Sequence, residues 1–192
     1  MDALLADSFE RLLAGVCSPA VVREVERSAD ASALWTEVEA SGFLGLLVLQ
    51  WGGATLRDAF PLWLACGAYA LPLPLAQTMW ARGVLAAAGL PMPAGPVALA
   101  PGTRREAGGA LRCPGVPFGA LARALLLRMP EGEVLCLPLA DAAVQRCGVH
   151  GSLQADIVWP SLPADALRLP PGTELQAAGA LITATLMAGA LQ

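Results

Sequence analysis

The first ninety residues carry the apolar and polar pattern of amphipathic helices. Over residues 2–14, apolar side chains recur every three or four positions and so share one helical face: Leu4, Leu5, Phe9, Leu12 and Leu13. Ser18 and Pro19 form the N-cap and first-turn pair of a second helix, which runs to about Arg27. The same periodicity predicts further helices near residues 30–42, 55–69 and 75–88. We therefore expect an all-helical N-terminal domain over residues 1–90.

The pattern changes at Pro91. Short apolar runs separated by Pro and Gly follow, at residues 97–100, 111–113, 124–129, 134–137, 144–147 and 155–159. Runs of this length bounded by turn residues are typical of strands. Residues 160–172 contain four prolines and predict a connector. We expect a middle β domain over residues 91–171, built as a small antiparallel β-barrel, and an α+β fold for the chain as a whole.

Residues 175–192 form a third pattern, a run without any charged side chain. Its few polar residues are spread around the helical wheel, so a helix here is expected to have apolar neighbours on nearly every side. Two interpretations are open at this point. Either residues 172–192 are the first helix of an incomplete C-terminal helical domain, or residues 175–192 are a membrane span of about the minimum length.

The composition points to a subunit of something larger. Charged residues make up 15% of the chain, aromatic residues 5%, and the mean hydropathy is +0.57. This leaves little polar surface to cover a small isolated domain, so we expect a homo- or hetero-oligomer. The net charge is −4 and the arginines are scattered. Nucleic acid is therefore excluded as a partner.

Missing residue types exclude several kinds of chemistry. The chain has no lysine, and a P-loop or a Schiff base needs an amine at a fixed position. A single histidine argues against a catalytic triad and against most zinc sites. The cysteines have no metal-ligand spacing and are expected to be reduced, which indicates a cytoplasmic protein: Cys17, Cys66, Cys113, Cys136 and Cys147. No signal peptide is expected, because a basic segment followed by an apolar core is missing.

Three segments resemble the acyl-CoA dehydrogenase family. Residues 41–53, SGFLGLLVLQWGG, are similar to a glycine-rich segment between helices of its N-terminal domain, and residues 55–79 to the helix and connector that follow. Residues 148–170, GVHGSLQADIVWPSLPADALRLP, are similar to the last strand and exit loop of its β domain. The predicted order of helices, strands and a further helix is also that of the family.

The resemblance implies an FAD-dependent oxidoreductase of fatty acid metabolism that converts acyl-CoA to 2-enoyl-CoA. In the family, FAD lies between a middle β-barrel and a C-terminal four-helix domain, and the subunits usually form tetramers. The catalytic base is a glutamate of the C-terminal domain, which is expected beyond Gln192 in this chain. We therefore assign no catalytic residue and no metal ligand, and expect these 192 residues alone to be inactive.

One segment departs from the family pattern. The family carries a Thr-Glu-Pro-x-x-Gly-Ser motif that contacts flavin and CoA groups, and here residues 99–104 read LAPGTR. The glutamate and the Gly-Ser pair are missing. The cofactor-binding residues are therefore unknown at this point.

Several residues have both a functional and a structural interpretation. His150 could be a ligand contact or an acid–base group, although a loop hydrogen bond is favoured. Arg104 and Arg105 could bind a CoA phosphate, although a solvated turn is favoured. Three large side chains lie on the helices that form the wall of the family's acyl-chain tunnel. They could line such a tunnel, although a position in the core is favoured: Trp63, Met79 and Trp80. The carboxylates near the β domain give no evident acid–base pair: Glu131, Glu133, Asp141, Asp156 and Asp165.

Three functional hypotheses follow. The chain is part of an FAD-dependent acyl-CoA dehydrogenase, or it is a non-catalytic structural or partner subunit of such an enzyme, for which the altered motif is the best evidence. The third and least favoured hypothesis is a membrane-anchored helical protein that uses residues 175–192 as its span. Alanine, glycine, threonine and glutamine dilute the apolarity of that run, and no basic residues flank it.

Overall fold

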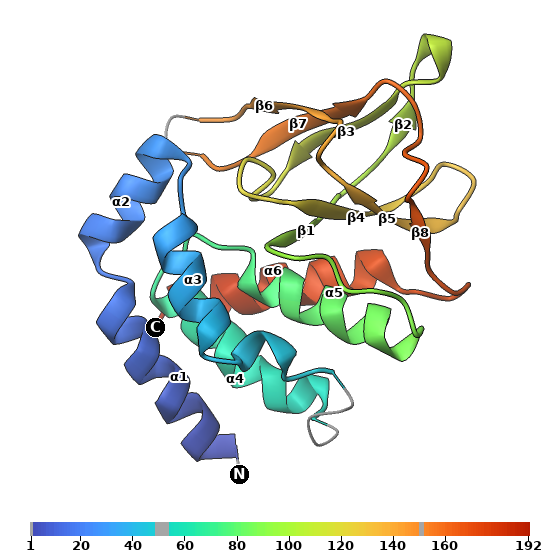
Figure 1. Cartoon of the computed structure of the whole chain (residues 1–192). Helices are drawn as coiled ribbons and strands as arrows, with labels where there is room; N and C mark the ends of the chain where they lie inside the picture. The colour runs from blue at the N-terminus through green and yellow to red at the C-terminus, as the bar shows by residue number, and fades with distance from the viewer. Residues whose placement is uncertain (1, 49–53, 150–151) are drawn as a thin grey trace.

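The computed structural model describes residues 2–48, 54–149 and 152–192, and it consists of a helical layer beneath two stacked β-sheets (Figure 1). The helices are α1 (Asp2–Val16), α2 (Pro19–Ser28), α3 (Ser32–Ala40), α4 (Leu56–Ala68), α5 (Leu75–Ala87) and α6 (Leu175–Ala190), with short 3-10 turns η1 (Phe43–Gly45) and η3 (Ala107–Gly109). The helices expected from the sequence are confirmed to within a few residues at each end.

The strands form two sheets of four strands each. The first sheet has the order β1 (Val97–Leu99), β4 (Ala124–Arg128), β5 (Val134–Pro138), β8 (Leu167–Arg168). The second has the order β2 (Arg104–Arg105), β3 (Leu111–Val116), β7 (Ala155–Trp159), β6 (Ala143–Arg146). Strands β1 and β4 are parallel, and the other pairs are antiparallel.

The α+β class is confirmed, but the expected closed antiparallel barrel is not. Among the described residues the two sheets are not hydrogen-bonded to each other along either edge. The chain passes from β1 to β2 through Pro101 and Gly102, and β2 and β8 are only two residues long. Pro101 lacks the N–H that would continue the ladder of β1, and strands of two residues form few ladder bonds.

The first sheet is buried on both faces, which explains why β4 is an uninterrupted apolar run. Leu125 and Leu127 face a core shared with the second sheet, whereas Ala124 and Leu126 belong to the core of the helical layer. A strand with both faces covered has no need for alternating polar residues. Trp159 of the second sheet donates its indole N–H to Pro138 O of the first, at 2.9 Å, and so ties the two layers together.

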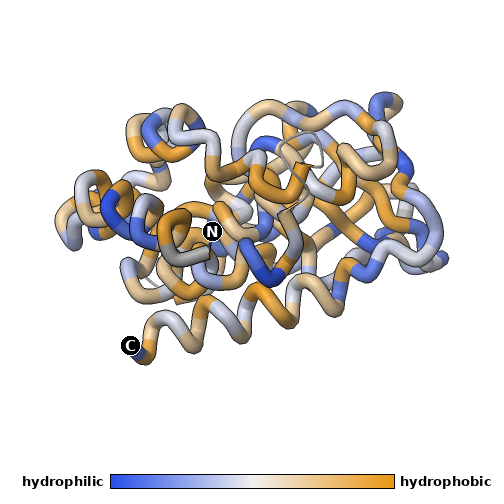
Figure 2. Tube along the Cα trace, turned by 90° about the horizontal axis from the view of Figure 1, so that it is seen from below, coloured by the Kyte–Doolittle hydropathy of each residue, from blue (hydrophilic) through white to orange (hydrophobic). Residues whose placement is uncertain are grey.

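Helix α6 packs directly against α4 through two glycines. A Cβ atom on Gly67 would lie 2.1 Å from Leu186 O, and one on Gly189 would lie 2.0 Å from Leu64 O. The absence of side chains at both positions therefore lets the two backbones touch. Seen from below, α6 runs along the lower edge of the molecule to the C-terminus (Figure 2). Within the described residues, no helix has both the length and the apolarity required to cross a bilayer.

Candidate functional site

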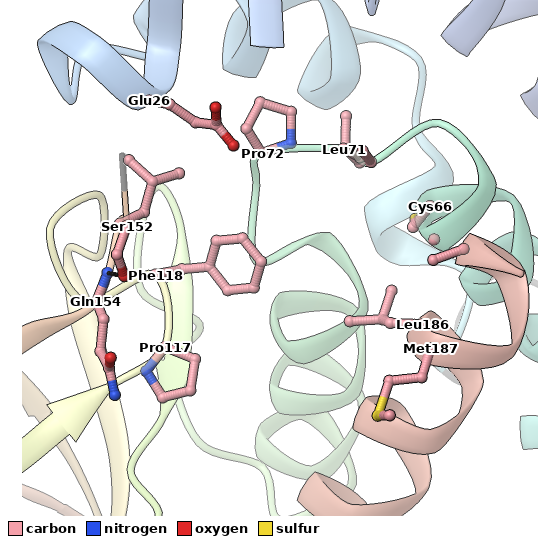
Figure 3. Close-up of a pocket in the computed structure, with 14 residues that line it drawn as sticks. Glu26, Cys66, Leu71, Pro72, Pro117, Phe118, Ser152, Gln154, Leu186 and Met187 are labelled. Carbon is pink, nitrogen blue, oxygen red and sulfur yellow. Dashed lines mark hydrogen bonds between the residues drawn. The ribbon is translucent and has the colours of Figure 1, made fainter. Parts of the chain in front are cut away.

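A cleft of about 570 Å³ opens where the C-terminal ends of α4 and α6 meet loops from the β-sheets (Figure 3). The wall is mostly apolar, with Leu71 and Pro72 after α4, Pro117 and Phe118 after β3, and Met187 on α6. Ser152, Gln154 and Glu26 supply the polar side chains of the lining. The cleft therefore combines a large apolar surface with a few polar groups, which is the usual composition of a small-molecule site.

The turn after β3 presents Phe118 to the cleft. Gly119 N donates to Val116 O at 3.0 Å and Leu121 N donates to Phe118 O at 2.9 Å, which closes a tight turn. Within it, Phe118 has φ +56°, a left-handed conformation that is uncommon for a bulky residue. Its ring points from the β-sheets toward the helices (Figure 3) and packs against the helical core.

The polar side chains of the cleft are held by their own loop. Gln154 Nε2 donates to Gly115 O at 2.7 Å, and Gln154 N donates to Ser152 Oγ at 3.1 Å. Gly115 adopts φ +60°, and a Cβ there would meet Gln154 Nε2 at 2.8 Å. The Gln154 amide is therefore locked against β3, and a ligand would meet a fixed polar edge.

A second hollow of about 610 Å³ adjoins the cleft, because Glu26 and Ser152 line both. Arg146 lies on its wall and donates to Glu26 O at 2.7 Å and to Ser152 O at 2.9 Å, which joins the end of α2 to the β6–β7 loop. Arg27 is paired with Glu24 at 2.6 Å, and this bond lowers the pKa of the Glu24 carboxyl. Arg23 and Arg146 give the rest of the hollow its positive charge.

The candidate tunnel residues are core residues in the structure. Trp63, Met79 and Trp80 are 1%, 0% and 8% exposed, and all three belong to the helical core. The indole N–H of Trp63 has no hydrogen-bond partner among the described residues. The structural interpretation of these side chains is therefore the better one, and none of them lines the cleft of Figure 3.

The charged candidates are dispersed over the β-sheets rather than gathered in a site. Arg105 pairs with Glu131 at 3.0 Å, Arg104 lies 3.8 Å from Glu106, and Glu133 pairs with Arg168. Asp141 and Asp165 lie in loops outside the cleft. Among the described residues no three potential metal ligands cluster. His150 lies outside the described residues.

Asp156 is the best-connected of these carboxylates. It accepts hydrogen bonds from Gly115 N at 2.9 Å, from Arg112 at 2.7 Å and from the Cys147 thiol at 3.4 Å. The Gly115 amide is the largest cause, and Arg112 the second, of a lowered pKa for the Asp156 carboxyl. Its contacts fix the β3–β7 pair behind the cleft, so its role is structural.

The thiols are protonated and inert in this setting. Burial raises the pKa of Cys66, Cys113 and Cys136, the last to about 12. For Cys147, desolvation is the largest cause of a raised pKa, and its bond to Asp156 adds to it. A thiolate nucleophile is therefore not available in these positions at neutral pH.

The structure buries the first part of the segment in which the resemblance predicts flavin contacts, whereas Pro101, Gly102 and Arg104 are exposed. Three backbone N–H groups of β1 and its exit are engaged: Val97 with Thr78 Oγ1 at 2.9 Å, Leu99 with Gln77 Oε1 at 2.9 Å and Ala100 with Leu126 O at 2.8 Å. Leu99 and Ala100 are buried. Helix α5 thus covers β1, and Val97, Leu99 and Ala100 offer no free backbone donor to an isoalloxazine ring.

Sequence reasoning missed the residues that build the cleft. Phe118 follows Pro117 in a segment that reads as an ordinary turn, and Arg146 and Ser152 carry no motif. Gln77 and Thr78 did leave a signal, since two adjacent polar residues interrupt an apolar helix and are buried in the structure. A buried polar pair on a helix indicates a specific partner, here the edge of β1.

Comparison with known proteins gives the fold. No family model and no curated protein matches the sequence. The ChsE4–ChsE5 complex from Mycobacterium tuberculosis superposes with a TM-score of 0.68 at 18% identity, and nitrososynthase from Micromonospora carbonacea var. africana with 0.55 at 16%. Each match covers 96% of this chain and 60% of the neighbour, so the chain spans about three fifths of their length. The chain therefore has the fold of the acyl-CoA dehydrogenase family, as its sequence resemblance implied.

Proposed function

We propose that this chain is a binding subunit of an acyl-CoA dehydrogenase-type assembly. In this proposal it takes the acyl part of an acyl-CoA thioester into the cleft of Figure 3, while the oxidation belongs to a partner subunit. The observation that carries the proposal is the contrast between an open apolar cleft and a closed β1. The first offers a place for an acyl chain, and the second occupies backbone donors at the start of the segment where flavin contacts are expected.

The chemistry of the cleft supports an acyl ligand. Its volume of about 570 Å³ is in the range that holds small organic molecules, and apolar side chains make up most of its wall. The neighbouring hollow suits the anionic part of the same ligand, because guanidinium groups bind phosphate well. Arg23 and Arg146 would supply that charge.

The described residues of the cleft lack a convincing acid–base pair. Among them Glu26 is the single carboxylate, and none is a histidine. Removal of an α-proton requires a base aimed at the substrate, with a second group that holds its position. The described residues therefore favour binding over catalysis.

A partner subunit is supported by the surface of α6 and by the fold neighbour. Leu181 and Met187 are 41% and 64% exposed on α6, a helix without a charged residue, and Leu191, which follows the helix, is 88% exposed. Exposed apolar surface of this kind is typical of contacts with another polypeptide. The ChsE4–ChsE5 structure is itself a complex of two different proteins. We place the assembly in the cytoplasm, where five unpaired cysteines stay reduced.

A second candidate is the enzyme itself, an FAD-dependent acyl-CoA dehydrogenase that forms 2-enoyl-CoA. The shared fold favours it. When bound, FAD would accept the hydride lost by the acyl chain. The residues of β1 do not fit the flavin, so this candidate requires flavin contacts elsewhere.

The two candidates are separated by an octanoyl-CoA titration followed by calorimetry, together with the absorption spectrum of the purified protein. The proposal predicts a colourless protein that binds octanoyl-CoA. It also predicts that Met187→Glu, which puts a charge into the cleft, weakens binding at least tenfold, whereas Leu181→Glu on the same helix does not. A yellow protein that turns over octanoyl-CoA would support the enzyme instead.

A further inference from the structure

Phe118 holds a conformation that its residue type disfavours. Its φ of +56° lies in the left-handed region, where a Cβ is crowded by the following carbonyl. The described residues include two other non-glycine positions with positive φ, and both are alanines: Ala29 and Ala70. Glycine would be the ordinary residue at such a position. A large ring here calls for an explanation.

The turn itself does not require an aromatic residue. The sterically demanding position is Gly119, where a Cβ would lie 3.0 Å from Val116 O, 3.1 Å from Val116 Cβ and 3.2 Å from Ala155 Cβ. Position 118 contributes a backbone carbonyl, which accepts from Leu121 N, and that bond is independent of the side chain. The reason for a phenyl ring must therefore lie in what the ring touches.

The ring lies inside the cleft. It projects from the β-sheets toward the helices, between Pro72 on one side and Leu186 and Met187 on the other (Figure 3). It is half-buried, packs against the helical core, and is the only aromatic side chain among the described lining residues. A rigid ring in this place takes up volume that a ligand chain would otherwise use.

We infer that Phe118 is a specificity-determining residue that limits how far an aliphatic chain enters the cleft. This inference rests on the proposed acyl-binding function and adds the residue that sets chain length. Strained backbone is retained where the surrounding structure enforces it, and it is concentrated at ligand sites. A shorter side chain at this position opens the cleft toward α6 and admits a longer acyl chain.

The test compares Kd values of butyryl-CoA, octanoyl-CoA and palmitoyl-CoA for the wild-type protein and for Phe118→Ala, Phe118→Gly and Phe118→Leu. The matched control is Phe60→Ala, because Phe60 is 40% exposed on α4 and does not line the cleft. We expect the preference for palmitoyl-CoA over butyryl-CoA to rise at least tenfold in the alanine and glycine variants, to rise less in the leucine variant, and to stay unchanged in the control. An unchanged preference in the folded variants overturns the inference.

A dye measurement separates this inference from the proposed function. If no variant binds an acyl-CoA, the proposed function fails, and the role of the ring is then tested with 1-anilinonaphthalene-8-sulfonate. Phe118→Ala and Phe118→Gly are expected to bind the dye more tightly than wild type, with no change for Phe60→Ala. Equal dye binding in all four proteins overturns the claim that the ring limits the cleft. Phe118→Leu serves if the smaller variants do not fold.

Discussion

At the scale of single residues, a few side chains conflict with their surroundings, either in backbone conformation or in polarity. Phe118 occupies a left-handed backbone position, and Gln77 and Thr78 lie 7% and 0% exposed in an apolar interior. Each conflict has a partner that explains it: the cleft for Phe118, and the edge of β1 for the polar pair.

The left-handed backbone at Phe118 is expected to reverse the usual order of stability of alanine and glycine variants. At an ordinary position, glycine is less stable than alanine by roughly 0.5–1 kcal/mol. At φ +56° the alanine Cβ carries a penalty of about 1–2 kcal/mol that glycine avoids. Phe118→Gly is therefore expected to be at least as stable as Phe118→Ala in urea unfolding. A clearly more stable alanine variant would show that the turn does not hold this conformation.

Thr78 joins α5 to β1 at a buried point. Its hydroxyl accepts from Val97 N at 2.9 Å, and its single proton points to Pro74 O at 2.8 Å and Val97 O at 3.1 Å. Thr78→Val removes these bonds and leaves the buried Val97 N–H unsatisfied, which costs about 1–3 kcal/mol of unfolding free energy. Thr36→Val is the matched control, since Thr36 is exposed, and it should cost less than about 0.5 kcal/mol. Equal losses for the two would contradict the pairing with β1.

The lowered pKa of the Asp156 carboxyl predicts that the stability of the fold depends on pH. Its folded pKa is below the ordinary value of 3.8, so the folded state holds the carboxylate more tightly than the unfolded chain does. The resulting stability is fully present above 3.8 and is lost as pH falls through the folded pKa. The gap in unfolding free energy between wild type and Asp156→Asn should therefore stay constant from pH 7 to 5 and narrow below pH 4. A gap that widens in acid would contradict the assignment.

At the scale of elements, the crossing of α4 and α6 depends on glycine. Gly189→Ala would place a methyl group 2.0 Å from Leu64 O, so the two helices must separate, at a cost of about 1–3 kcal/mol. Gly179→Ala on the same helix meets nothing within 4 Å and should instead stabilise by up to about 1 kcal/mol. Urea unfolding tests whether the two variants change the free energy of unfolding in opposite directions. The same sign for both would mean that α6 does not pack on α4 as described.

The sequence predicted the elements better than their contacts. The spacing of Leu5, Phe9 and Leu13 and the Ser18–Pro19 pair involve only neighbours in the chain, and the helix and the N-cap that they predict are present in the structure. The division into two sheets is not readable in this way, because β1 pairs with β4 across more than twenty residues of intervening chain. The cleft cannot be read from local patterns either, because it brings together residues as distant in the chain as Glu26 and Met187. Local sequence patterns do not specify contacts between residues that are so far apart in the chain.

At the scale of the whole molecule, three layers and an apolar helix surround a cleft that faces a charged hollow. The net charge of −4 and the low charged content leave α6 as a face suited to another polypeptide rather than to water. Under the proposed function, acyl binding does not depend on flavin binding, because the cleft is open while β1 is covered by α5.

The most direct test of that independence is the calorimetric Kd of octanoyl-CoA for the purified chain, measured first without flavin and then with saturating FAD. The structure predicts saturable binding without flavin and the same Kd, within about twofold, when FAD is present. Binding that appears only after FAD is added would contradict the account, because the acyl site would then depend on a flavin that the residues of β1 do not hold.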